Sequence, residues 1–157
     1  MKRLIFSVLI TALVLWMPVQ SSDVGKLRPV QVVVIRKQAQ QVVILTDTAD
    51  RGQGSSCALA MQDLHNSTPA VVYLDTAEFL LIGEGAQEDA KYLCGLLKKD
   101  VQVYLEENVQ DLSLAAQYLA VHGGGTPLSL WEQGAVLPVL REEEGRMNLS
   151  KNMEKSA

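Results

Sequence analysis

Short runs of β-branched and aliphatic residues alternate with segments of helical periodicity, and this order constrains the fold more than any other feature of the chain. The first two runs, residues 30–36 (VQVVVIR) and 41–46 (QVVILT), are separated by a short polar stretch and predict a β-hairpin. Further runs of strand length follow at residues 70–74, 78–82, 101–105 and 135–140. Strands interleaved with helices predict an α/β domain with a mixed β-sheet of about four to six strands, covered by three helices.

The three helices are predicted from apolar residues that recur every three or four positions. The first begins after Ser55 or Ser56, either of which can serve as N-cap, and ends near His65. The second, residues 86–99, has the most regular apolar stripe, with acidic residues in its first turn and lysines in its last. The third is capped by Asp111 and ends at a run of three glycines, which can adopt the left-handed conformation of a C-cap.

Residues 1–21 are predicted to be a signal peptide or a membrane-anchor helix. Lys2 and Arg3 precede an uncharged apolar run over residues 4–19. Sixteen helical residues span about 24 Å, which is short for a hydrocarbon core of about 30 Å and favours a signal peptide. Both interpretations stay open. Each places the protein outside the cytoplasm, either on the outer face of a membrane or, if the signal is cleaved, as a secreted protein.

The rest of the chain is predicted to be one α/β domain over residues 22–140, followed by a disordered polar tail over residues 141–157. Residues 22–29 are interpreted as a polar linker. The net charge is −4, and removal of residues 1–21 with their two basic residues leaves 12 basic and 18 acidic residues. Binding to nucleic acid requires clustered Lys and Arg, so this class of partner is excluded.

The sequence offers weak material for catalysis, metal binding or cofactor binding, and we expect none of the three. His65 and His122 are the only histidines, and neither has a Cys, His or carboxylate at metal-ligand spacing. Cys57 and Cys94 are interpreted as buried apolar thiols, although a disulfide between them stays open. A small secreted hydrolase that uses Cys57, His65 and His122 is the least favoured alternative.

A short segment between a predicted strand and a predicted helix, residues 52–57 (GQGSSC), is similar to part of a dinucleotide phosphate-binding loop. The third glycine of that loop is missing. We therefore interpret Gly52 and Gly54 as turn residues and the serines as a helix cap.

A wider pattern runs through Gly54-Ser55-Ser56, Ala58-Leu59, Leu64, Tyr73-Leu74 and the segment Leu80 to Glu84. It resembles the N-terminal region of the C subunits of bacterial spore germinant receptors, over roughly residues 30–119. That region has a glycine-led turn, a helix with Ala-Leu and Leu, a Tyr-Leu strand, and a hydrophobic strand that ends in Gly-Glu. Four features differ: no Cys follows the apolar N-terminal run for lipid attachment, the family's opening acidic-aromatic segment is missing, Thr76 stands where the family has His, and the sequence has one domain where family members continue through two more.

The resemblance implies a non-enzymatic, extracytoplasmic, membrane-associated domain that binds a membrane protein partner during spore germination or sporulation. The alternative is a generic exported module that binds a ligand or peptide. We expect partner contacts on three loop-rich segments, residues 47–54, 83–85 and 123–131. The candidate contact residues are Asp47, Asp50, Arg51, Glu84 and Trp131.

Overall fold

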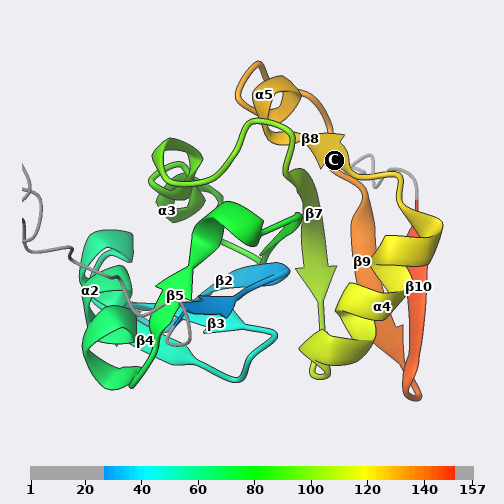
Figure 1. The fold of residues 1–157 in the computed structure, drawn as a ribbon. Coiled ribbons are helices and arrows are strands. Elements are labelled where there is room, and N and C mark those ends of the chain that lie inside the picture. The colour runs from blue at the N-terminus through cyan, green and yellow to red at the C-terminus, as the bar shows by residue number, and fades with distance from the viewer. Residues whose placement is uncertain (1–26, 151–157) are drawn as a thin grey trace, which may run out of the picture.

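A computed structural model describes residues 27–150, and its centre is a mixed eight-stranded sheet in the order β10-β9-β7-β6-β2-β3-β4, with β8 paired to β7 (Figure 1). Its strands are β2 (Val32–Gln38), β3 (Gln41–Thr46), β4 (Arg51–Gly54), β6 (Phe79–Ile82), β7 (Gln102–Glu107), β8 (Thr126–Pro127), β9 (Val139–Glu143) and β10 (Arg146–Ser150). β2, β6, β7 and β9 are parallel neighbours, and antiparallel strands flank them on both sides. The predicted mixed α/β class is confirmed, although the sheet has more strands than the four to six expected.

A second, smaller sheet joins β1 (Leu27–Pro29) and β5 (Val71–Tyr73) in parallel. The last three residues of the segment interpreted as a linker therefore belong to a strand. The predicted signal peptide or anchor helix, residues 1–21, lies outside the described residues. Within the described part of the chain, no helix has both the length and the apolar character needed to cross a membrane.

Helices cover both faces of the large sheet. α2 (Cys57–Ser67), α3 (Gln87–Ala90) and α5 (Leu128–Trp131) contribute to the core on one face, and α4 (Leu112–His122) covers the other. Alternate residues of β2 and β6 point to opposite faces, so each strand supplies both cores. Burial on both faces explains why these strands read as unbroken apolar runs.

Two of the three predicted helices begin and end where their capping residues place them. The side chain of Ser56 accepts a hydrogen bond from the Leu59 N–H, and Asp111 accepts one from the Leu114 N–H at 2.9 Å. α4 ends at Gly123, which has a φ of 55°. The N-cap predictions for these two helices are confirmed, and α4 ends at the predicted glycine run, although the ψ of Gly123 is −153° rather than that of a left-handed helix.

The prediction of one helix over residues 86–99 is wrong. The chain forms only the short α3 and a 3-10 turn, η3 (Leu93–Gly95). The apolar stripe is nevertheless buried in the core, at Ala86, Ala90, Leu93, Cys94 and Leu97. Successive single turns bury a stripe of this spacing as well as a continuous helix does, and the glycine at position 95 weakens the helix.

The interpretation of Gly52 and Gly54 as turn residues is also wrong, because both lie in strand β4 against α2. A Cβ on Gly52 would lie 2.2 Å from the Ala60 carbonyl oxygen, and one on Gly54 would lie 2.6 Å from the Ala60 nitrogen. Only glycine therefore allows the helix to approach this strand so closely.

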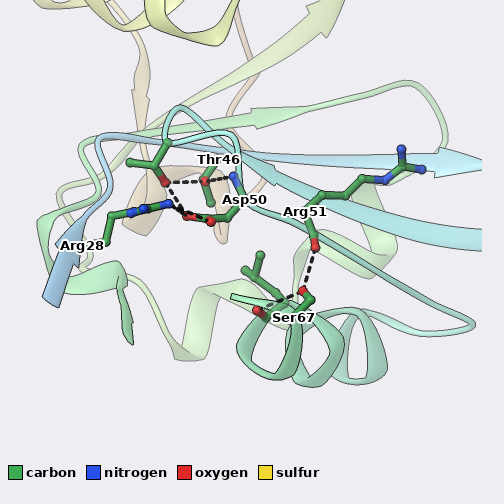
Figure 2. Close-up of polar contacts among 7 residues, drawn as sticks. Arg28, Thr46, Asp50, Arg51 and Ser67 are labelled. Carbon is green, nitrogen blue, oxygen red and sulfur yellow. Dashed lines mark hydrogen bonds and ion pairs between the residues drawn. The ribbon is translucent and has the colours of Figure 1, made fainter. Parts of the chain in front are cut away.

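α2 also covers the exposed edge of β4. Asp63 accepts a hydrogen bond from the Gln53 N–H at 2.9 Å. The Ser67 hydroxyl donates to the Arg51 carbonyl at 3.2 Å, as Figure 2 shows. These bonds satisfy backbone groups that an edge strand otherwise presents to a second chain.

The predicted disordered tail, residues 141–157, is wrong for residues 141–150. These residues form the end of β9 and all of β10, which pair as an antiparallel hairpin. Glu144 (φ 51°) and Gly145 (φ 73°) occupy the turn, and two consecutive positive φ angles are typical of a type I′ hairpin turn. Met147 is buried against α4 in the second core, so the hairpin is part of the domain. Residues 151–157 lie outside the described residues.

Candidate functional site

A polar cleft of about 530 Å³ opens at the carboxyl ends of the parallel strands β2, β6 and β7. In open α/β sheets, this end of the parallel strands is where ligands and partners are usually bound. The cleft is lined by side chains and backbone of the segments that follow the three strands, namely Arg36, Lys37, Gln38, Gly83, Glu84 and residues 106–110.

A buried ion pair between Arg36 and Glu106 forms one wall of the cleft. Arg36 Nε donates to Glu106 Oε1 at 2.6 Å, and Nη2 donates to Oε2 at 3.2 Å. The same guanidinium also donates to the Val109 carbonyl, and the Val109 N–H donates to Glu106. The Glu106 side chain is only 5% exposed and that of Arg36 is 24% exposed. This network ties β2 to β7 across the end of β6, and it holds both oxygens of the carboxylate inside the protein.

Gly83 lies under this ion pair, directly after β6. A Cβ at this position would be 3.1 Å from Arg36 Cγ and 3.1 Å from Glu106 Oε1. These contacts are tighter than usual, so a side chain here would require the ion pair to shift by a few tenths of an ångström. The following residue, Glu84, is exposed at the mouth of the cleft.

Two further ion pairs lie near the cleft. Lys37 is 3.3 Å from Asp89, and Arg141 Nε donates to Glu107 at 2.8 Å. The hydrogen bond that Arg141 donates to Glu107 raises the pKa of Arg141 above its ordinary value. The cleft is therefore bordered by charges of both signs.

Asp50 belongs to an internal network at the opposite end of β2 (Figure 2). Arg28 Nη1 donates to its two carboxylate oxygens at 3.0 and 3.3 Å, and the Thr48 hydroxyl donates to it at 2.7 Å. The Asp50 N–H donates to the Thr46 hydroxyl at 3.2 Å. This carboxylate therefore joins the β3–β4 turn to β1.

Asp47 has a similar internal role, whereas Arg51 points outward. Asp47 Oδ1 accepts hydrogen bonds from the N–H groups of Gln31 and Val32, at 3.1 and 3.2 Å, where β2 begins. The guanidinium of Arg51 extends away from α2 (Figure 2) and lies 3.4 Å from Gln53 Oε1. Of the three candidates in this loop, Arg51 is the exposed one.

Trp131 lies in a third place, on α5. It is half-buried against the first core and lines a hollow with Cys94 and Glu132. An ion pair of 2.7 Å between Lys99 and Glu132 joins α5 to the segment after η3. The structure therefore does not bring the five candidate contact residues together. Asp47 and Asp50 line one hollow, Glu84 lines the cleft at the carboxyl ends of β2, β6 and β7, Trp131 lines a third hollow, and Arg51 lines none of these three.

The residues of the hydrolase alternative are also separated. Cys57 and His65 lie eight positions apart on α2, about 12 Å along the helix axis. His122 lies at the end of α4 on the other face of the sheet, and its ring packs against that of Tyr118 with the centroids 4.3 Å apart and the planes tilted by 35°. This arrangement offers no hydrogen bond between the thiol and either imidazole.

Both thiols are buried and unpaired, as the apolar interpretation expects. Burial raises the pKa of Cys57 to about 12, with a further contribution from the Asp89 carboxylate. Burial also raises the pKa of Cys94. Among residues 27–150, no group of three His, Cys, Asp or Glu side chains is placed to hold a metal ion.

Sequence reasoning missed Arg36 and Glu106, the residues that shape the cleft. A signal was present, since each is a charged residue at or near the end of an apolar strand. Their pairing depends on β2 and β7 lying on either side of β6, which no local pattern reports.

No protein-family model matches the chain, and no curated protein or solved structure matches it.

Proposed function

We propose that this protein is a non-enzymatic, extracytoplasmic, membrane-associated domain that binds a membrane protein partner during bacterial spore germination or sporulation. Its surface for that partner is the polar cleft at the carboxyl ends of β2, β6 and β7. Exposed Glu84 is its central contact.

The observation that carries this proposal is the packing around Gly83. The Gly-Glu pair at the end of β6 is the last part of the pattern that resembles germinant-receptor C subunits, and it lies at the mouth of the cleft. Gly83 packs closely against the ion pair of Arg36 and Glu106, where a Cβ would lie 3.1 Å from atoms of both side chains. The other parts of the pattern form the adjoining unit of β4, α2, β5 and β6 on the same side of the domain.

The character of the cleft favours a protein partner over a small molecule. Small-molecule pockets are mostly apolar with a few placed polar groups, whereas the rims of protein interfaces are polar and charged. Here the mouth carries Glu84, Asn108 and Gln110, all exposed, beside the charged side chain of Lys37. Charges of this kind set the orientation of a partner and the rate of encounter more than they set affinity.

The first test follows a C-terminally tagged chain by fractionation of the native host through growth, sporulation and spore purification. Enrichment in the spore inner-membrane fraction is the expected result. Presence only in vegetative membranes or in the medium, or a host that makes no spores, contradicts the germination role.

The second test introduces a photo-crosslinking amino acid at Glu84 in that host. The matched control carries the same amino acid at Gln117, an exposed position on α4. We expect a crosslink to one membrane protein from position 84 and none from position 117. Equal labelling from both positions would exclude the cleft as the partner surface.

A generic exported ligand- or peptide-binding module is the second candidate, and the size of the cleft favours it. A volume of about 530 Å³ lies within the range of small-molecule sites, about 300–1,000 Å³. This candidate expects the chain in soluble form outside the cell and saturable binding of a peptide that Glu84→Lys abolishes.

A further inference from the structure

The small β1–β5 sheet presents an uncharged face to the outside. In its parallel register Leu27 lies beside Val71 and Pro29 beside Tyr73, and these four residues share one side. Val71 is 54% exposed and Tyr73 is 39% exposed. The alternate residues point to the other side, where Val72 is buried in the first core and Arg28, 41% exposed, is bonded to Asp50. We call the four outward residues the β1–β5 face.

This face is joined directly to the most apolar segment of the sequence. The uncharged run over residues 4–19 ends eight residues before Leu27. Eight residues reach at most about 28 Å when fully extended. A domain of this size is roughly 35 Å across, judged from the usual radius of gyration for its length. The tether is thus shorter than the domain is wide, so a chain anchored by the run cannot turn the β1–β5 face fully away from the bilayer.

We propose that the β1–β5 face rests on the lipid headgroup and acyl-chain boundary, with Tyr73 as its main contact. This inference rests on the proposed membrane association, with the run over residues 4–19 retained as the anchor. Contact at this face leaves the cleft beside Glu84 available to a partner protein.

The chemistry of the face suits that position. A tyrosine side chain has an apolar ring and a polar hydroxyl, and such side chains concentrate where a membrane meets water. The tether also raises the local concentration of the surface to the millimolar range, so a small apolar face is sufficient for contact. Val121 has a larger exposed fraction, 79%, but lies on α4 on the opposite face of the large sheet (Figure 1).

The experiment places a single tryptophan on the face and measures its contact with lipid. The full chain is reconstituted into vesicles of phosphatidylcholine and phosphatidylglycerol that contain acyl-brominated phosphatidylcholine, which quenches tryptophan in the bilayer. Trp16→Phe and Trp131→Phe remove the native tryptophans. Tyr73→Trp then reports on the β1–β5 face, and Val121→Trp in the same background is the matched control.

We expect the brominated lipid to quench the tryptophan at position 73 at least about threefold more than the one at position 121. An interfacial contact buries side chains about 5–10 Å into the headgroup and acyl-chain boundary, which brings position 73 close to the quencher. Position 121 lies on the opposite face of the large sheet and has no such contact. Equal quenching at the two positions, in a chain that floats with the vesicles, overturns this inference and leaves the proposed membrane association intact. Failure of the unmodified chain to float with the vesicles overturns both. If Trp131→Phe unfolds the chain, both variants are made with Trp131 retained. The emission of Trp131 is then the same in the two variants, so the difference in quenching still compares position 73 with position 121.

Discussion

Replacing Gly52 by alanine tests the packing of α2 on β4 directly. The added Cβ would lie 2.2 Å from the Ala60 carbonyl oxygen and 2.6 Å from Leu64 Cβ. An ordinary contact needs about 3.4 Å, so α2 must move outward by about 1 Å. A gap of that size forfeits a quarter to a half of the dispersion energy of the contacts it opens. We expect a loss of about 3 kcal/mol of unfolding free energy, at the upper end of the usual cost of overpacking.

The assay is urea denaturation of a chain that begins at Ser22, followed by far-ultraviolet circular dichroism. Gly95→Ala is the matched control, because a Cβ on Gly95 meets no atom within 4 Å. We expect that variant to lie within about 1 kcal/mol of the parent chain, since alanine only removes conformational freedom there. Were Gly52→Ala to cost less than about 1 kcal/mol, the close approach of α2 to β4 would be refuted, because an unstrained Gly→Ala change is neutral or stabilising by up to about 1 kcal/mol.

Three further predictions use the same urea assay. Glu106→Gln leaves the Arg36 guanidinium without its counter-charge and should lower the unfolding free energy by about 2 kcal/mol. This is below the range for fully buried pairs, because Arg36 is partly exposed. Glu143→Gln at an exposed position is the control, and an equal effect of the two changes would show that the buried pair contributes nothing. Asp111→Ala removes the cap of α4 and should cost about 1 kcal/mol, so an unchanged midpoint would contradict the cap. Cys57 has a pKa raised from 9.0 to about 12 by burial, so folding favours its neutral form; that contribution is complete below pH 9 and is lost as pH rises from 9 towards 12. Cys57→Ala should flatten the decline over this range, and an identical pH profile would mean that the folded thiol ionises as easily as the unfolded one.

The parts of the fold that the sequence predicts are those decided by neighbouring residues. Ser56 and Asp111 cap helices because each side chain reaches a backbone N–H three residues ahead. The apolar runs at β2 and β3 are read as strands because their residues are buried in the sheet, and the short polar stretch between them lets the two strands pair as a hairpin. Such interactions leave a local signature in the sequence, which is why these predictions are confirmed.

The hairpin of β9 and β10 shows how a local signature can be masked. Its charged residues suggest a disordered tail, yet Met147 and Leu149 alternate with Arg146, Asn148 and Ser150. That period of two is typical of a strand with one face on a core, here the core under α4. Composition outweighed periodicity in the sequence-based interpretation, and periodicity was the better guide.

β4 and α3 mark what no local pattern could predict. Gly52 and Gly54 lie in a strand because another backbone, that of α2, lies against them, and a sequence does not record which element will approach. The apolar stripe over residues 86–97 indicates only that one side of the segment is buried. Two short turns, α3 and η3, satisfy that spacing as well as one continuous helix would. The sheet and its packing partner decide between these outcomes.

The candidate contact residues divide for the same reason. An acidic residue in a polar loop has the same appearance in a sequence whether it serves a partner or the fold itself. For Asp47 and Asp50, the oxygens are engaged by the N–H groups that begin β2 and by Arg28, so mutation of either would damage the domain before it informed on binding. Glu84 follows a glycine that packs closely against the Arg36–Glu106 ion pair, and its own side chain is exposed at the cleft. A partner surface is best sought where the backbone is fixed by the core and the side chain is not, and among the five candidates Glu84 meets both conditions most fully.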